Sequence, residues 1–199
     1  MNSQSRFIVL EGLDGVGKST LASNLAEQLK GMLMSTPGEA FKAVRNQAME
    51  AFAGDELAKA LFYSATVSSE GRKARSITNQ GKPVVMDRYW ASTVSYAIAR
   101  GVSADLDCLA DELVRPDITV LITLDERTRL ERLQHRGMMA EDRETFATSF
   151  MQTVLRELEE RSDITVDITG LTPEDAVKTV ASRINSYFDP VTHATEAPL

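Results

Sequence analysis

The sequence has little of several residue types that define other classes of protein. Its 199 residues include one cysteine, Cys108, and two histidines, His135 and His193. These counts exclude a framework of intramolecular disulfides and a cysteine-rich zinc site, and they leave little for a histidine metal cluster. No apolar run approaches the roughly 20 residues of a membrane span, and the polar start lacks the apolar core of a signal peptide. We therefore expect a reduced, cytoplasmic protein that does not bind a membrane.

Positive charge is also scarce. The 22 Lys and Arg residues are outnumbered by 29 Asp and Glu residues, which gives a formal net charge of -7. Because binding of duplex nucleic acid through its phosphates needs clustered Lys and Arg, we expect no polymeric nucleic acid as a partner. The content of 43% hydrophobic and 26% charged residues is typical of a globular protein. We expect one domain over residues 1–188 and a disordered tail over 189–199, which has no hydrophobic periodicity.

Short apolar runs alternate with segments of helical periodicity along the chain. Phe7-Ile-Val-Leu10 is a continuous apolar run, as expected of a strand buried on both faces of a parallel sheet. The expected strands cover 7–10, 32–35, 84–86, 117–124 and 164–168. Helices are expected over 39–53, 55–80, 91–101, 104–114 and 126–136. Three further helices are expected with one end fixed: one ends near Gly31, one ends near Arg161, and one begins at Thr172. This order predicts an α/β fold, a single three-layer domain with a mostly parallel five-stranded sheet and helices on both faces.

The strongest pattern is Gly12-Leu-Asp-Gly-Val-Gly-Lys-Ser19, which fits G-x-x-x-x-G-K-[ST] at every fixed position. Glycines allow successive backbone N–H groups to point at a phosphate, and the following helix adds its positive N-terminal end. Lys18 is expected to reach the β- and γ-phosphates and Ser19 to bind Mg²⁺. A chance glycine-rich turn is the alternative, but a strand precedes the segment and an amphipathic helix follows it. The predicted ATP-binding residues are Gly12, Asp14, Gly15, Val16, Gly17, Lys18, Ser19 and Thr20.

Two further features fit phosphate chemistry. Asp87 ends an apolar strand, at the sheet edge where ligands of α/β folds bind, and is predicted to be a second Mg²⁺ ligand; an exposed acid that begins a turn is the alternative. Arg136 and Arg143 flank a glycine-containing connection, which predicts a lid near 137–143 whose arginines stabilise the transferred phosphoryl group. A solvated helix face is the alternative for both arginines. Arg129 is expected on such a solvated face, and Cys108 is expected to be buried.

With these segments in place, the chain resembles the thymidylate kinase family of P-loop kinases. The resemblance depends on residues 7–20, 61–63, 87–89 with 92 and 96, 116–119, and the pairs 136–137 and 142–143. It implies a P-loop kinase domain that transfers the γ-phosphoryl group of ATP, with Mg²⁺, to a nucleoside monophosphate such as dTMP. It also implies catalytic roles for Lys18, Arg136 and Arg143. The substrate-binding residues that follow from it are Asp14 at the sugar hydroxyl, Phe62 against the base, Arg88 at the acceptor phosphate, and Tyr96.

Three positions depart from the family pattern. Ser35-Thr-Pro-Gly-Glu39 lacks the arginine that the family places there, so that Arg45 is the candidate to replace it at the acceptor phosphate. Thr66 and Ala97 stand where the family has long polar side chains directed at the base. We therefore expect a base pocket that is roomy and less polar than the family norm, with weak selection for thymidylate. A kinase of the same fold that acts on a deoxynucleoside or another small molecule, and a P-loop nucleotide switch protein, are the alternatives; a homodimer is left open.

Overall fold

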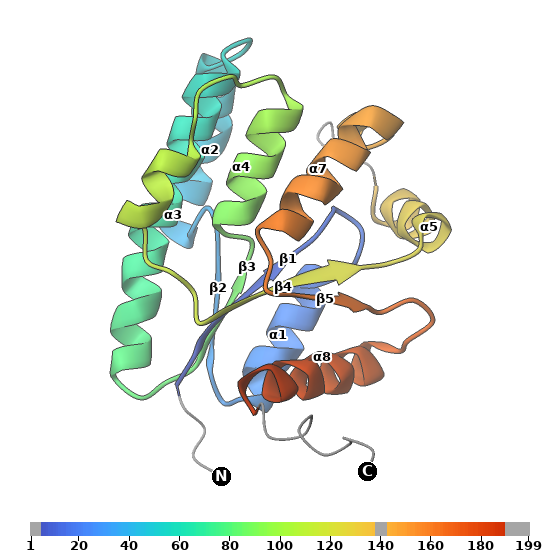
Figure 1. Cartoon of the computed structure of the whole chain (residues 1–199). Helices are drawn as coiled ribbons and strands as arrows, with labels where there is room; N and C mark the ends of the chain where they lie inside the picture. The colour runs from blue at the N-terminus through green and yellow to red at the C-terminus, as the bar shows by residue number, and fades with distance from the viewer. Residues whose placement is uncertain (1–4, 138–142, 190–199) are drawn as a thin grey trace, which may run out of the picture.

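The computed structural model describes residues 5–137 and 143–189. All four strand pairings of its five-stranded sheet are parallel, in the order β2-β3-β1-β4-β5 (Figure 1). The strands are β1 Phe7–Glu11, β2 Met32–Ser35, β3 Val84–Asp87, β4 Ile118–Thr123 and β5 Ile164–Asp167. The predicted α/β fold is thereby confirmed. The predicted tail lies outside the described residues except for 189, and so does the predicted lid except for 137 and 143.

Helices connect the strands. They are α1 Lys18–Gln28, α2 Glu39–Ala51, α3 Glu56–Asn79, α4 Trp90–Ala99, α5 Glu126–Arg136, α7 Thr148–Glu160 and α8 Pro173–Phe188. Side-chain caps fix several of their starts: the Thr172 hydroxyl accepts a hydrogen bond from the Asp175 N–H at 3.1 Å, and Asp125 caps α5 in the same way. None of the helices in the described part of the chain combines the length and the hydropathy that crossing a lipid bilayer requires.

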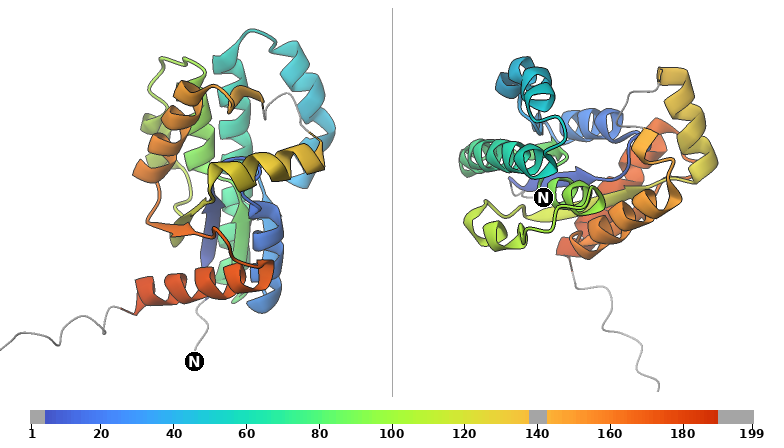
Figure 2. Two further views of the ribbon diagram at one scale, coloured as in Figure 1. Left: turned by 90° about the vertical axis from the view of Figure 1, so that its right-hand side faces the viewer. Right: turned by 90° about the horizontal axis from the view of Figure 1, so that it is seen from above.

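The sheet is covered by helices on both faces (Figure 2). In β1 the side chains of Ile8 and Leu10 belong to a core with α1 and α8, whereas Phe7 and Val9 pack with residues of α3. This alternation explains why β1 is apolar at every position: it is buried on both sides. Because all strand pairs are parallel, the carboxyl ends of the strands lie at the same edge of the sheet. The segments that follow β1 and β3 at this edge form the site.

The structure corrects the prediction for residues 104–114. That segment contains only a short 3₁₀ helix, Asp107–Glu112, and Cys108 is exposed rather than buried. Asp105 explains part of the difference, because its carboxylate accepts a hydrogen bond from the Asp107 N–H at 3.0 Å, a local bond that competes with α-helical pairing. The helix that ends near Arg161 is confirmed as α7, which begins at Thr148.

Candidate active site

The loop between β1 and α1 is compact, as its glycines predict. Gly12 has φ 148°, and a Cβ at this position would lie 2.5 Å from the carbonyl oxygen of Ile122, so that only glycine lets the loop pass this close to β4. Lys18 begins α1, is only 5% exposed, and donates a hydrogen bond to the Leu13 carbonyl at 2.7 Å. The other predicted ATP-binding residues are on the loop and the first turn of α1: Asp14, Gly15, Val16, Gly17, Ser19 and Thr20.

Arg88 connects this loop to β3. Its φ of 66° lies in the left-handed region, which non-glycine residues seldom adopt. Its Nη2 lies 2.7 Å from Asp14 Oδ1, and its Nη1 donates to Ser92 Oγ at 2.9 Å. Tyr96 Oη approaches the other Asp14 oxygen at 3.4 Å. Although burial favours the neutral acid, the charges of Arg88 and Lys18 lower the pKa of Asp14, so that Asp14 is a carboxylate at neutral pH.

Asp87 and Ser19, the two predicted magnesium ligands, are adjacent. The Ser19 hydroxyl donates to Asp87 Oδ2 at 2.5 Å, although the two residues are 68 positions apart. Asp87 Oδ1 is buried and has no hydrogen-bond partner among the described residues. A carboxylate oxygen without a partner and a hydroxyl beside it are the oxygen ligands that Mg²⁺ prefers. The pair therefore fits a magnesium ion.

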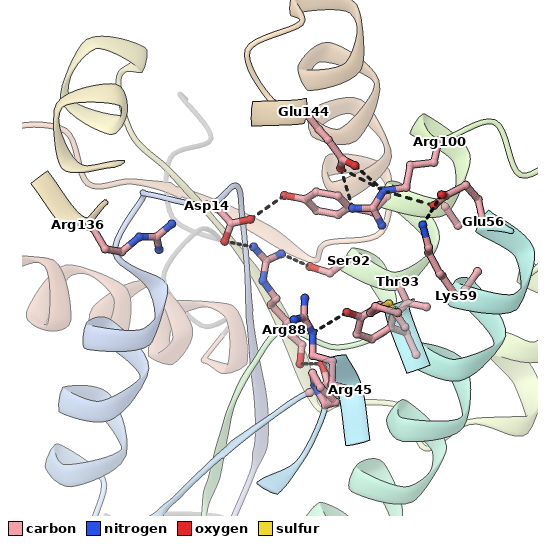
Figure 3. A pocket seen from close by; sticks show the side chains of 17 residues that line it. Asp14, Arg45, Glu56, Lys59, Arg88, Ser92, Thr93, Arg100, Arg136 and Glu144 are labelled. Atoms are coloured by element: carbon pink, nitrogen blue, oxygen red, sulfur yellow. Dashed lines mark hydrogen bonds and ion pairs between the residues drawn. The ribbon is translucent and has the colours of Figure 1, made fainter. Parts of the chain in front are cut away.

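A cavity of about 440 Å³ opens beside the loop (Figure 3). Five predicted site residues line it: Asp14, Arg45, Arg88, Tyr96 and Arg136. Arg45 comes from α2, and its Nε donates to the hydroxyl of Tyr63 on α3 at 2.9 Å. The structure thus brings together side chains from the phosphate loop, α2, α4, α5 and the residue after β3.

Of the residues that the sequence analysis associated with the acceptor base or the lid, Phe62, Thr66 and Arg143 do not line this cavity. Phe62 packs edge to face against Phe41 and Tyr63, with ring centroids 6.4 and 5.6 Å apart, and it is Tyr63 that lines the cavity. Arg143 is exposed and does not line it. Thr66 is fully buried, and its hydroxyl donates to the Tyr63 carbonyl at 2.7 Å. Of the two positions that lack long polar side chains, only Ala97 therefore borders the cavity.

Further charged side chains border the cavity beside the apolar Ala97. Four charged side chains that the sequence analysis did not single out border it: Glu56, Lys59, Arg100 and Glu144. They lie on α3, at the end of α4, and just before α7, and they approach one another only in the folded chain. No local sequence signal marks them, because each also fits an ordinary solvated helix face.

Arg129 was expected on a solvated face, and this is also wrong. It is 1% exposed, and its guanidinium donates to Glu126, to the Asp14 carbonyl at 3.1 Å and to the Thr145 hydroxyl at 3.2 Å. Arg132, three residues further along α5, donates to the Val16 carbonyl at 2.8 Å. The i, i+3 spacing places both arginines on one face of α5, and that face contacts the phosphate loop instead of water.

A structural role for Glu11 was not predicted from the sequence. This buried carboxylate ends β1 and accepts hydrogen bonds from the N–H groups of Tyr89 at 2.8 Å and Ser92 at 3.1 Å, so that it fixes the start of α4. Burial raises its pKa, while the Ser92 hydroxyl and Arg88 oppose that shift. The sequence does contain a signal for this role, since Glu11 is an acidic residue that ends an apolar strand, as Asp87 is.

A parallel sheet with a glycine-rich phosphate loop after β1, a lysine at the start of α1 and an acid at the end of β3 defines the class of P-loop nucleotide-binding proteins. The described residues contain no group of three or more His, Cys, Asp or Glu side chains that could hold a metal by themselves.

Comparison with known proteins gives the family. The family model described as thymidylate kinase matches residues 10–180. A probable thymidylate kinase of Pyrococcus horikoshii is 34% identical over 149 residues, covering 68% of this chain and 73% of the relative; one of Archaeoglobus fulgidus is 31% identical over 140 residues, covering 67% and 71%. The solved thymidylate kinase of Candida albicans has the same fold, with a TM-score of 0.74, 24% identity, and coverage of 94% of this chain and 93% of that one. The chain belongs to the thymidylate kinase family and is a nucleotide kinase.

Proposed function

We propose that this protein transfers the γ-phosphoryl group of ATP to dTMP, with Mg²⁺, in the cavity beside the phosphate loop. The observation that carries the proposal is that three guanidinium groups, those of Arg45, Arg88 and Arg136, border the same cavity beside Asp14. Guanidinium groups gathered around one cavity suit an acceptor that carries a phosphate. The relatives described as thymidylate kinases support dTMP as that acceptor.

The donor phosphates bind to the loop N–H groups and to Lys18 in this proposal. Ser19 and Asp87 hold the Mg²⁺, which neutralises charge on the phosphates when it is bound. Arg136, on the cavity wall, and Arg143, at the end of the predicted lid, stabilise the charge that develops on the phosphoryl group.

The acceptor phosphate binds to Arg88 and Arg45 in this proposal. Asp14 holds Arg88 in place and borders the cavity, which supports its predicted contact with a sugar hydroxyl. For stacking against the base, Tyr63 is better placed than Phe62, because Tyr63 borders the cavity. An aromatic face of either type provides the same stacking surface.

Titration calorimetry with dTMP and thymidine tests the acceptor assignment. Arg45→Met should weaken dTMP binding by about tenfold or more, because a charge-assisted contact to phosphate is lost, and should leave thymidine binding nearly unchanged. Arg72→Met, an exposed arginine on α3, is the matched control and should change neither. Equal losses for dTMP and thymidine would show that Arg45 does not contact the acceptor phosphate.

A further inference from the structure

The side of the cavity away from Asp14 and Arg136 carries a second group of charges (Figure 3). Lys59 and Arg100 are balanced there by the carboxylates of Glu56 and Glu144, so the group has no excess charge. A second phosphate would leave its own charge uncompensated at such a place. A neutral polar group that both donates and accepts hydrogen bonds suits it better.

Three of these side chains form an ordered series. Lys59 Nζ lies 2.6 Å from Glu56 Oε1, and Arg100 Nε lies 3.8 Å from Glu56 Oε2. Along the cavity wall the series is donor, acceptor, donor, because an ammonium and a guanidinium only donate and a carboxylate only accepts. The described residues take one of the three Lys59 donors and make no hydrogen bond with Arg100 Nη1. The series therefore retains hydrogen-bonding capacity for a ligand.

Arg100 is held in position from two further directions. Its Nε and Nη2 donate to Glu144 Oε2 at 3.1 and 2.7 Å, and its guanidinium carbon lies 5.5 Å from the centre of the Tyr96 ring. The side chains of Lys59 and Arg100 are each about one-fifth exposed, and that of Glu56 is 30% exposed. The series is thus partly desolvated and fixed, which strengthens discrimination between ligands that match it and ligands that do not.

We propose that Lys59, Glu56 and Arg100 together recognise the imide edge of the acceptor base, the carbonyl, N–H and carbonyl groups that thymine and uracil share. That edge presents acceptor, donor, acceptor, which is the complement of the series on the cavity wall. Cytosine differs, because it has an amino group in place of one carbonyl and no hydrogen on the ring nitrogen. It would set an amino group against a cation and a lone pair against the Glu56 carboxylate.

This inference rests on the proposed function, and one set of kinetic measurements separates the two. The kcat/KM of the wild-type enzyme is measured with dTMP, dUMP and dCMP, since dUMP and dCMP differ only at the edge in question. We expect dUMP to be preferred over dCMP by about tenfold or more. Transfer to dTMP but comparable use of dUMP and dCMP would overturn the inference alone; transfer to no nucleoside monophosphate would overturn the proposed function and the inference with it.

The variant Glu56→Gln tests the middle position of the series. An amide can donate to the ring nitrogen of cytosine, so the preference for dUMP over dCMP should fall by about tenfold. Glu174→Gln is the matched control, because Glu174 also lies in the first turn of a helix and pairs with a lysine, Lys178, at 2.8 Å. An unchanged preference in a folded Glu56→Gln enzyme would contradict the assignment. Comparable use of dUMP and dCMP by the wild-type enzyme overturns the inference even if that variant fails to fold.

Discussion

The surroundings of Lys18, at the end of the phosphate loop, change the pH at which it loses its charge. Burial and the nearby positive charge of Arg88 lower its pKa to about 8, while Asp14 and Asp87 oppose the shift. Its ammonium donates to the Leu13 carbonyl at 2.7 Å. Bound phosphates would favour the charged form of the lysine, so nucleotide binding above the shifted pKa must be accompanied by uptake of a proton.

The affinity for ATP should therefore depend on pH. As the pH rises through about 8, Lys18 of the free enzyme loses its proton, and the affinity should fall by up to about tenfold per pH unit. Calorimetric titration between about pH 7 and pH 10 measures this directly. Lys18→Arg should remove the dependence, because a guanidinium remains charged throughout this range. A wild-type affinity that stays constant across the range would contradict the lowered pKa.

At the scale of elements, α5 positions the phosphate loop. Arg129 and Arg132 donate to the carbonyl oxygens of Asp14 and Val16, on either side of Gly15. A Cβ on Gly15 would lie 2.8 Å from Leu133 of the same helix, so the loop and α5 are in close contact. Because the loop N–H groups must point at phosphate, hydrogen bonds that hold its carbonyls also fix the orientation of those N–H groups.

Arg129→Met should loosen this contact. The loss of a buried guanidinium that makes several hydrogen bonds should reduce the free energy of unfolding by about 2 kcal/mol, and the KM for ATP should rise while dTMP affinity changes little. Urea unfolding and steady-state kinetics measure the two effects. Arg127→Met on the same helix, with a side chain that is 89% exposed, is the control and should change neither quantity. If both variants behave alike, Arg129 does not position the loop.

At the scale of the whole molecule, local patterns were sufficient for the fold but not for the whole site. The strands and most helices follow from apolar runs and helical periodicity, and the phosphate loop follows from a motif of eight residues. The burial of Arg129 and the exposure of Cys108 depend on which neighbouring element packs over them, and periodicity alone does not specify that. The meeting of Glu56, Lys59 and Arg100 depends on how α3 and α4 pack, so no sequence window contains it.

In the proposed reaction the phosphate loop binds ATP and the cavity beside it binds a phosphorylated acceptor, so that the phosphoryl group passes directly from one to the other. The most direct test is incubation of the enzyme with ATP labelled in the γ-phosphoryl group, Mg²⁺ and either dTMP or thymidine, followed by separation of the products. The account predicts label in dTDP when dTMP and Mg²⁺ are both present, and none in dTMP when thymidine is the acceptor. Label in dTMP formed from thymidine, or label released only as inorganic phosphate, would contradict it.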